Sequence, residues 1–185
     1  MMSVEAARYA AFLRGMNVGG HRLTNDELRA HFAALGFDQV ATFRASGNVV
    51  FAATPEHPRE IALRIERGLA VALGYEVPTF IRSASQLRAI ATAQPFSAGE
   101  LASSAGKLQV ALLAASPSSG ARKKVLTLAD DADRLAFGEC ELYWLPSGGI
   151  LDSPLDLKAI AKLLGVMSMR TQNTIEQITA KHFAD

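Results

Sequence analysis

The sequence has little cysteine and no long apolar run. Cys140 is the single cysteine among 185 residues, so the chain can form neither an internal disulfide nor a zinc site built on several cysteines. Such cysteine usage is typical of a reducing compartment, and we expect a cytoplasmic protein. No apolar run approaches the roughly 18 residues of a membrane span, and the first residues lack the pattern of a signal peptide. We therefore expect no membrane partner.

The sequence also lacks an excess of charge of either sign. Its 19 basic and 18 acidic residues give a formal net charge of +1, so no overall field attracts nucleic acid or an anionic membrane. Hydrophobic residues make up 49% and charged residues 20%, which is close to the average of globular proteins and argues against disorder. The length suffices for one ordinary domain or two small ones.

Several well-known motifs are missing as well. No G-x-G-x-x-G is present, so a dinucleotide-binding fold has no support. Residues 15–20 have the glycine spacing of a phosphate-binding NTPase loop, but His21 and Arg22 stand where that motif needs lysine and a magnesium-binding hydroxyl. The four histidines are scattered, with no pair at i,i+4. We expect no metal site and no cofactor.

Apolar periodicity predicts the element order β-α-β-β-α-β in the first part of the chain. The expected elements are a strand at 9–13, a helix from 24 to 35, strands at 40–43 and 49–51, a helix at 58–73 and a strand at 77–81. Thr24 and Glu27 form the pattern of a capping box at the start of the first helix. This order is that of a ferredoxin-like domain, which we expect to occupy residues 1–82.

A second series of elements follows a short helix that begins at Ser83 and a loop at 95–106 that we expect to be a linker. The expected elements are a strand at 108–113, a helix at 121–128, strands at 135–137 and 142–145, helices at 155–164 and 171–183, and no clear final strand. The fold class is therefore α+β, with two ferredoxin-like lobes whose antiparallel sheets carry helices on one face. We divide the chain into a lobe at 1–82, a helix and linker at 83–106, and a second lobe at 107–185.

Strand order in the first lobe predicts a ligand-binding site. The first and second strands of a ferredoxin-like sheet run parallel with the third between them. The loop after the first strand and the hairpin between the second and third strands therefore share one edge of the sheet. The residues expected there are Arg14, Gly15, Asn17, Gly19 and Gly20 from the loop, and Arg44, Ser46, Gly47 and Asn48 from the hairpin. Arginines offer bidentate donors, glycines let a ligand approach the backbone, and the helix start adds positive potential. This set predicts a small phosphate- or carboxylate-bearing ligand.

Each of these residues also has a purely structural explanation. Glycines occur in loops because they tolerate positive φ, and Ser46 and Asn48 are ordinary turn residues. Arg14 could simply pair with Asp26. Before the last helix, Thr171 or Asn173 could act as N-cap, which explains much of the polar stretch there.

Two long blocks of the sequence, residues 13–20 and 36–51, resemble the signatures of a bacterial family called domain of unknown function 1697. The similarity continues through the segments 74–78, 82–83 and 95–96. The family ends in a segment like Arg-Asn-Trp-Asn-Thr, which here is Arg-Thr-Gln-Asn-Thr, so the carried-over site residues are Arg170, Asn173 and Thr174. The resemblance implies two ferredoxin-like α+β lobes and no established activity.

Three classes of function remain open from the sequence. The first is a module that binds the anionic ligand. The second is an enzyme acting on such a ligand through Ser46 or a carboxylate such as Asp26, although no base stands at a recognisable spacing from Ser46. The third is single-stranded nucleic-acid binding on an open sheet face, which the missing aromatic RNA-binding pattern and the small net charge disfavour.

Overall fold

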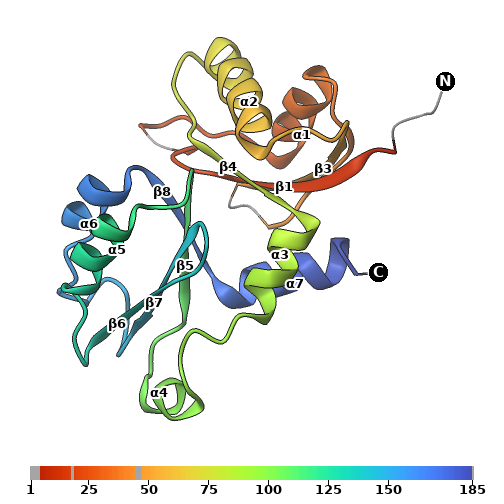
Figure 1. Ribbon diagram of the computed structural model, residues 1–185. Coiled ribbons are helices and arrows are strands. Elements are labelled where there is room, and N and C mark those ends of the chain that lie inside the picture. The colour runs from red at the N-terminus through yellow and green to blue at the C-terminus, as the bar shows by residue number, and fades with distance from the viewer. Residues whose placement is uncertain (1–4, 18, 45–46, 185) are drawn as a thin grey trace. The chain divides into compact units, whose positions relative to one another are not determined.

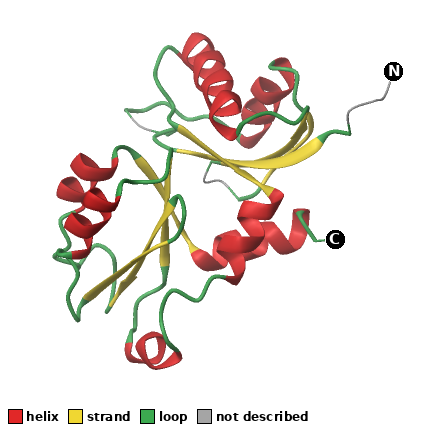
Figure 2. Ribbon diagram, viewed as in Figure 1, coloured by secondary structure: helices red, strands yellow, loops and turns green. Residues whose placement is uncertain are grey.

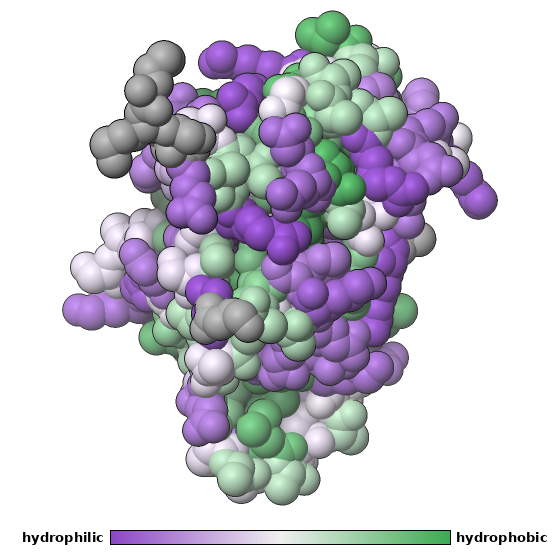
Figure 3. Space-filling view, turned by 90° about the vertical axis from the view of Figure 1, so that its right-hand side faces the viewer, coloured by the Kyte–Doolittle hydropathy of each residue, from purple (hydrophilic) through white to green (hydrophobic). Residues whose placement is uncertain are grey.

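The computed structural model describes residues 5–17, 19–44 and 47–184 (Figure 1). The chain divides into two compact units. The first unit is Met1–Arg88 together with Ile178–Asp185, and the second unit is Ala89–Gln177. In the described part of the chain, no helix combines the length and apolar character needed to cross a membrane. On the face shown in Figure 3, hydrophilic side chains are interspersed with smaller hydrophobic areas.

The first unit is a four-stranded antiparallel sheet with two helices on one face (Figure 2). Its elements are β1 (Ala7–Leu13), α1 (Asn25–Ala34), β2 (Asp38–Thr42), β3 (Asn48–Ala53), α2 (Pro58–Leu73), β4 (Thr79–Ser83) and the start of α3 (Ala84–Thr92). The strands are ordered β2-β3-β1-β4, so β1 and β2 are parallel with β3 between them. The predicted ferredoxin-like topology is confirmed.

Alternation along the strands builds the core of the first unit. Leu13 on β1 and Phe51 on β3 belong to a buried cluster with Phe32 of α1 and Ile65 of α2. The intervening residues of the sheet, which point to the other face, are buried too, with Ala10, Phe12, Val50 and Phe80 at most 4% exposed. The second face of the sheet is therefore covered at these positions too.

The second unit repeats the topology. Its elements are α4 (Ala98–Ser103), β5 (Gln109–Leu113), α5 (Ser119–Leu126), β6 (Asp133–Phe137), β7 (Glu141–Pro146), α6 (Leu157–Leu164), β8 (Met167–Thr171) and the start of α7 (Gln172–His182). The strands are ordered β6-β7-β5-β8, each antiparallel to its neighbours. The prediction of two α+β lobes with antiparallel sheets is confirmed.

Two details of the sequence prediction were wrong. A final strand, β8, is present and pairs with β5 from Met167 opposite Leu113 to Thr171 opposite Gln109. Its polar residues and two methionines give no strand-like pattern, so its extended conformation is set by hydrogen bonding to β5. The expected linker also contains α4, which a capping box of Ser97 and Glu100 begins and which is too short to show periodicity.

The repeat extends to the end of the last strand of each sheet. Arg82 donates from Nη1 to the preceding carbonyl oxygen, of Ile81, at 2.9 Å, and Arg170 does the same to Met169 at 2.8 Å. Each arginine is followed by a hydroxyl residue that ends the strand, and the next helix begins directly after it. The two halves therefore share a structural repeat down to single hydrogen bonds, although the sequence shows no obvious residue repeat.

Candidate functional site

The loop between β1 and α1, residues 14–24, lies beside the hairpin between β2 and β3. The amide nitrogen of Leu13 donates to the carbonyl oxygen of Gly47 at 2.8 Å, and Phe12 pairs in register with Asn48. At the other side, the Asn25 side-chain amide donates to the carbonyl oxygen of Arg44 at 3.3 Å. The loop and the hairpin thus form one edge of the first unit, which we call the loop edge. Ser46 lies outside the described residues.

The connection between α2 and β4 is a third part of the loop edge. The Tyr75 hydroxyl donates to the carbonyl oxygen of Met16 at 2.8 Å, and the Arg14 amide nitrogen donates to the carbonyl oxygen of Pro78 at 2.9 Å. The His21 and Tyr75 rings lie 5.0 Å apart. Met16 is only 5% exposed, so the loop is anchored from beneath. Sequence reasoning missed Tyr75 because its contacts come from far along the chain.

The loop encloses a hollow on the surface of the first unit. Its volume is about 500 Å³, and it is lined by Asn17, Gly20, His21, Arg22, Leu23 and Thr24. The Asn17 side-chain oxygen accepts from the amide nitrogen of Leu23 at 3.0 Å and so shapes the wall. Among the described lining residues two are basic and none is a carboxylate. Sequence reasoning placed Asn17 and Gly20 in the site but used His21 and Arg22 only to reject an NTPase loop.

Three glycines give the loop its path. Gly15, Gly19 and Gly20 have φ of 69°, 63° and 85°, a region that other residues rarely adopt. A Cβ at any of the three would meet open space, so backbone conformation and not crowding requires glycine.

The N-terminus of α1 does not add to the positive potential as the sequence suggested. The Glu27 carboxylate accepts from the amide nitrogen and hydroxyl of Thr24, both at 2.8 Å, and these hydrogen bonds lower the pKa of Glu27. Asp26, in the same turn, pairs with Arg29. Two carboxylates therefore already complement this helix start. The pairing of Asp26 with Arg29 replaces the expected alternative of an Arg14–Asp26 pair.

The described hairpin residues divide into two roles. Asn48 is 1% exposed, and its side-chain amide donates to the carbonyl oxygen of Phe43 at 3.1 Å. Gly47 has φ of 68°, and a Cβ there would lie 3.2 Å from both Cβ and O of Leu13. These two residues hold the hairpin closed against β1. Arg44 is exposed, in a left-handed conformation with φ of 58°, and its guanidinium carbon lies 5.4 Å from the Phe43 ring centroid.

The other predicted site residues, Arg170, Asn173 and Thr174, belong to the second unit. Arg170 donates to the hydroxyl of Ser168 at 2.9 Å, and burial lowers the pKa of Arg170 to about 10. The Thr171 hydroxyl accepts from the amide nitrogen of Thr174 at 3.2 Å, so Thr171 is the N-cap of α7. Asn173 accepts from the side chain of Gln177 at 3.5 Å. These residues have contacts at the junction of β8 and α7.

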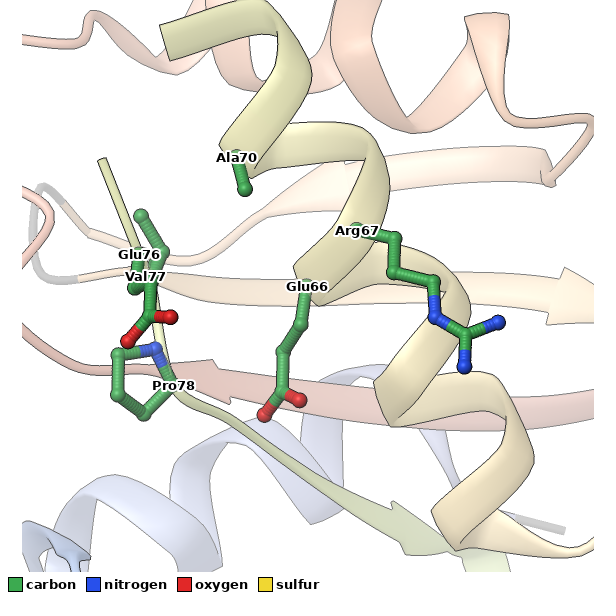
Figure 4. Close-up of a pocket in the computed structure, with 6 residues that line it drawn as sticks. All are labelled: Glu66, Arg67, Ala70, Glu76, Val77 and Pro78. Atoms are coloured by element: carbon green, nitrogen blue, oxygen red, sulfur yellow. The ribbon is translucent and has the colours of Figure 1, made fainter. Parts of the chain in front are cut away.

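A second hollow of the first unit has a different character. It has a volume of about 290 Å³ and is lined by Glu66, Arg67, Ala70, Glu76, Val77 and Pro78. Figure 4 shows Glu66 and Arg67 projecting from α2, with Glu76 and Pro78 on the connection that follows it. Glu66 also accepts from the amide nitrogen of Thr79 at 3.0 Å. With two carboxylates and one guanidinium, this hollow does not suit an anion. Within the described residues, no cluster of three or more His, Cys, Asp or Glu could hold a metal ion.

Comparison with known proteins agrees with this architecture. The structure is similar to that of the conserved bacterial protein SP0830 from Streptococcus pneumoniae, with a TM-score of 0.71 and 19% sequence identity over 96% of this chain and 98% of that chain. At this identity the similarity shows a shared fold. No curated protein is significantly similar to the sequence. The family described as Protein of unknown function (DUF1697) matches residues 6–143, and the chain therefore belongs to the DUF1697 family.

Proposed function

We propose that the protein binds a small ligand with a phosphate or carboxylate group at the loop edge of its first unit. The observation that carries this proposal is the hollow in the loop, which has two basic side chains and no carboxylate among its described lining residues. Arg14 at the start of the loop and the exposed Arg44 of the hairpin add two further cations to the same edge.

The second unit supports the proposal because it has the same topology without such a loop. The connection between β5 and α5 is only residues 114–118, against residues 14–24 in the first unit. A longer loop costs more conformational entropy to close, and each glycine in it adds to that cost. The fold does not require this length, which is why we assign it to ligand binding.

The chemistry of the loop edge suits an anion that needs no metal. Guanidinium groups donate paired hydrogen bonds to phosphate and carboxylate oxygens. A hydrogen bond to a charged group contributes about 1.5–3 kcal/mol, so two arginines together with backbone amides of a glycine loop would suffice for a weakly to moderately bound ligand.

The experiment is a thermal-shift titration with inorganic phosphate and with citrate at constant ionic strength. We expect a concentration-dependent rise in Tm with at least one of the two anions, because a ligand of the folded state stabilises it by mass action. Arg14→Ala combined with Arg22→Ala should reduce that rise. Arg67→Ala, which removes an exposed arginine from the other hollow, is the matched control and should retain it. The same rise in the double variant as in the wild type would contradict the proposal.

The two alternatives gain less support. A catalytic role for Ser46 would need a base, and the sequence offers none at a recognisable spacing. A nucleic-acid module of the ferredoxin-like type reads bases on the sheet face away from its helices. In the first unit, Phe12 and Phe80 on that face are buried, so stacking with bases there would require them to become exposed.

A further inference from the structure

A second group of basic side chains gathers around the ring of Phe43, on the hairpin of the first unit. The Lys181 ammonium lies 5.9 Å from the Phe43 ring centroid, and the His182 ring meets the Phe43 ring edge to face with centroids 6.5 Å apart. Arg44 flanks the same ring. The last turn of α7 thus brings two basic residues to the hairpin.

Arg8 on β1 joins this group. It alternates with Tyr9, a core residue under α1 and α2, so it lies on the opposite face of the sheet. Its guanidinium carbon lies 5.6 Å from the ring centroid of Phe183, the residue after His182. The charges of Lys181 and Arg8 both lower the pKa of His182, after burial as the largest cause.

These charges lack an acidic counterpart in the part of the chain that the structure describes. Arg8, Lys181 and His182 form no ion pair with any described carboxylate. Asp38, which is level with Arg8 in the ladder with Ala52 between them, forms none either. The buried Nε of Arg8 and the buried Nε2 of His182 have no hydrogen-bond partner among the described atoms. Like charges and unsatisfied donors at one place are an arrangement that a bound anion would stabilise.

We propose that Arg8, Lys181 and His182 form a second anion site, which binds a phosphate group on the sheet face opposite α1 and α2. The guanidinium and the ammonium supply fixed positive charge, and the imidazole adds a third positive charge when it is protonated. This site goes beyond the loop edge, because none of its three side chains lines the hollow between β1 and α1.

The site has a defined dependence on pH. The charges of Lys181 and Arg8 both oppose protonation of His182, whereas a bound anion favours it. The pKa of His182 is therefore higher in the bound state, and the anion binds more tightly as the pH falls through that range. Sulfate is a suitable probe because its charge stays at −2 throughout the titration of His182. The charge of phosphate would itself change over the same pH range.

The experiment is an NMR titration of the histidine ring signals of the full-length protein in chloride and in sulfate at equal ionic strength. We expect sulfate to raise the pKa of His182 by about half a unit or more, a threefold or larger coupling. His57, whose Nδ1 accepts from the amide nitrogen of Arg59 at the start of α2, is the internal control and should not respond. Inorganic phosphate should produce the same selective displacement of the His182 signal at a fixed pH.

Variants separate this site from the loop edge. Lys181→Gln together with Arg8→Gln should remove the response of His182 to sulfate, while Lys158→Gln, at an exposed position of α6, should leave it intact. Arg14→Ala with Arg22→Ala should also leave it intact, so failure of the loop edge and failure of this site are distinguishable. Identical titration of His182 in chloride and in sulfate would overturn the proposal, as would a full response in the Lys181 and Arg8 double variant.

Discussion

The same sheet edge is built in opposite ways in the two units. In the first unit the connection at residues 14–24 is long, rich in glycine and hollow. In the second unit the connection at residues 114–118 is short, and a single side chain closes the edge. That side chain is Arg122 of α5, which donates to the carbonyl oxygens of Gly138 at 2.8 Å and Glu139 at 2.7 Å.

The difference teaches what the topology itself needs. In both units an amide nitrogen at the end of the first strand donates to the hairpin, from Leu13 to Gly47 and from Leu113 to Cys140. The amide nitrogens of Phe43 and Gly138 likewise each donate to the following strand, at the carbonyl oxygens of Asn48 and Glu141. These shared bonds define the fold. The units differ in how the rest of the edge is filled. In the second unit the Arg122 side chain fills it, whereas in the first unit the loop leaves a hollow there.

The largest expected effect is that of removing the closing side chain of the second unit. Arg122→Ala deletes a guanidinium that also donates to Pro117 at 3.2 Å and to Ser116 at 3.0 Å, so we expect a loss of about 3 kcal/mol in the free energy of unfolding. The first-unit counterpart, Asn25→Ala, removes one hydrogen bond and should cost about 0.5–1 kcal/mol. Urea unfolding measures both. Equal losses would show that the two edges are closed alike.

The hairpin position gives the second effect. Gly47→Ala introduces a Cβ 3.2 Å from Leu13 at a positive φ, and we expect a loss of about 2 kcal/mol in the free energy of unfolding. Cys140→Ala, at the matching position of the second unit, should change it by about 0.5 kcal/mol or less. Urea midpoints of the two variants provide the comparison, and a Gly47→Ala protein as stable as the Cys140→Ala protein would contradict it.

Gly20 of the first connection and Gly120 in the first turn of α5 should respond in opposite directions. Gly20→Ala places alanine at φ of 85° and should destabilise the protein by about 1 kcal/mol, although space for the methyl group is open. Gly120→Ala falls inside α5, with open space around it, and should stabilise the protein by about 0.5–1 kcal/mol. Thermal unfolding of the two single variants should therefore show Tm changes of opposite sign.

The smallest effect concerns a motif that both units share. Capping-box hydrogen bonds lower the pKa of Glu27 in α1 and of Glu100 in α4. A lowered pKa in the folded state means stability that is present above the unfolded value and is lost as the pH falls through the folded one. The free energy of unfolding should therefore fall less between about pH 6 and about pH 3 in Glu27→Gln and in Glu100→Gln than in the wild type. The two variants should differ from the wild type by similar amounts. Urea midpoints at the two pH values check this, and a marked difference between the variants would mean that the capping boxes are not equivalent.

Local signals made much of the first unit predictable. The capping box of Thr24 and Glu27, the helix stop at Gly74 and the alternation in the strands are all contained within a few neighbouring residues. Element order then fixed which loops share an edge, because a ferredoxin-like sheet has one strand order. The hydrogen bond from Leu13 to Gly47 follows from that order.

Features that depend on distant residues could not be predicted in this way. Tyr75 reaches Met16 across 59 positions of sequence, and neither residue carries a local sign of the contact. Strand β8 exists because β5 offers it a ladder, not because its own residues favour a strand. Arg122 looks like any helical surface arginine until the carbonyl groups of the hairpin are known.

Residues 178–185 complete the first unit, although all of residues 89–177 precede them in the chain. During synthesis the first unit must therefore wait, because its final segment leaves the ribosome only after the whole second unit has been made. At roughly 5–20 residues per second this delay lasts several seconds, far longer than helix or hairpin formation takes. The part of the protein that is translated first is thus the last to be finished.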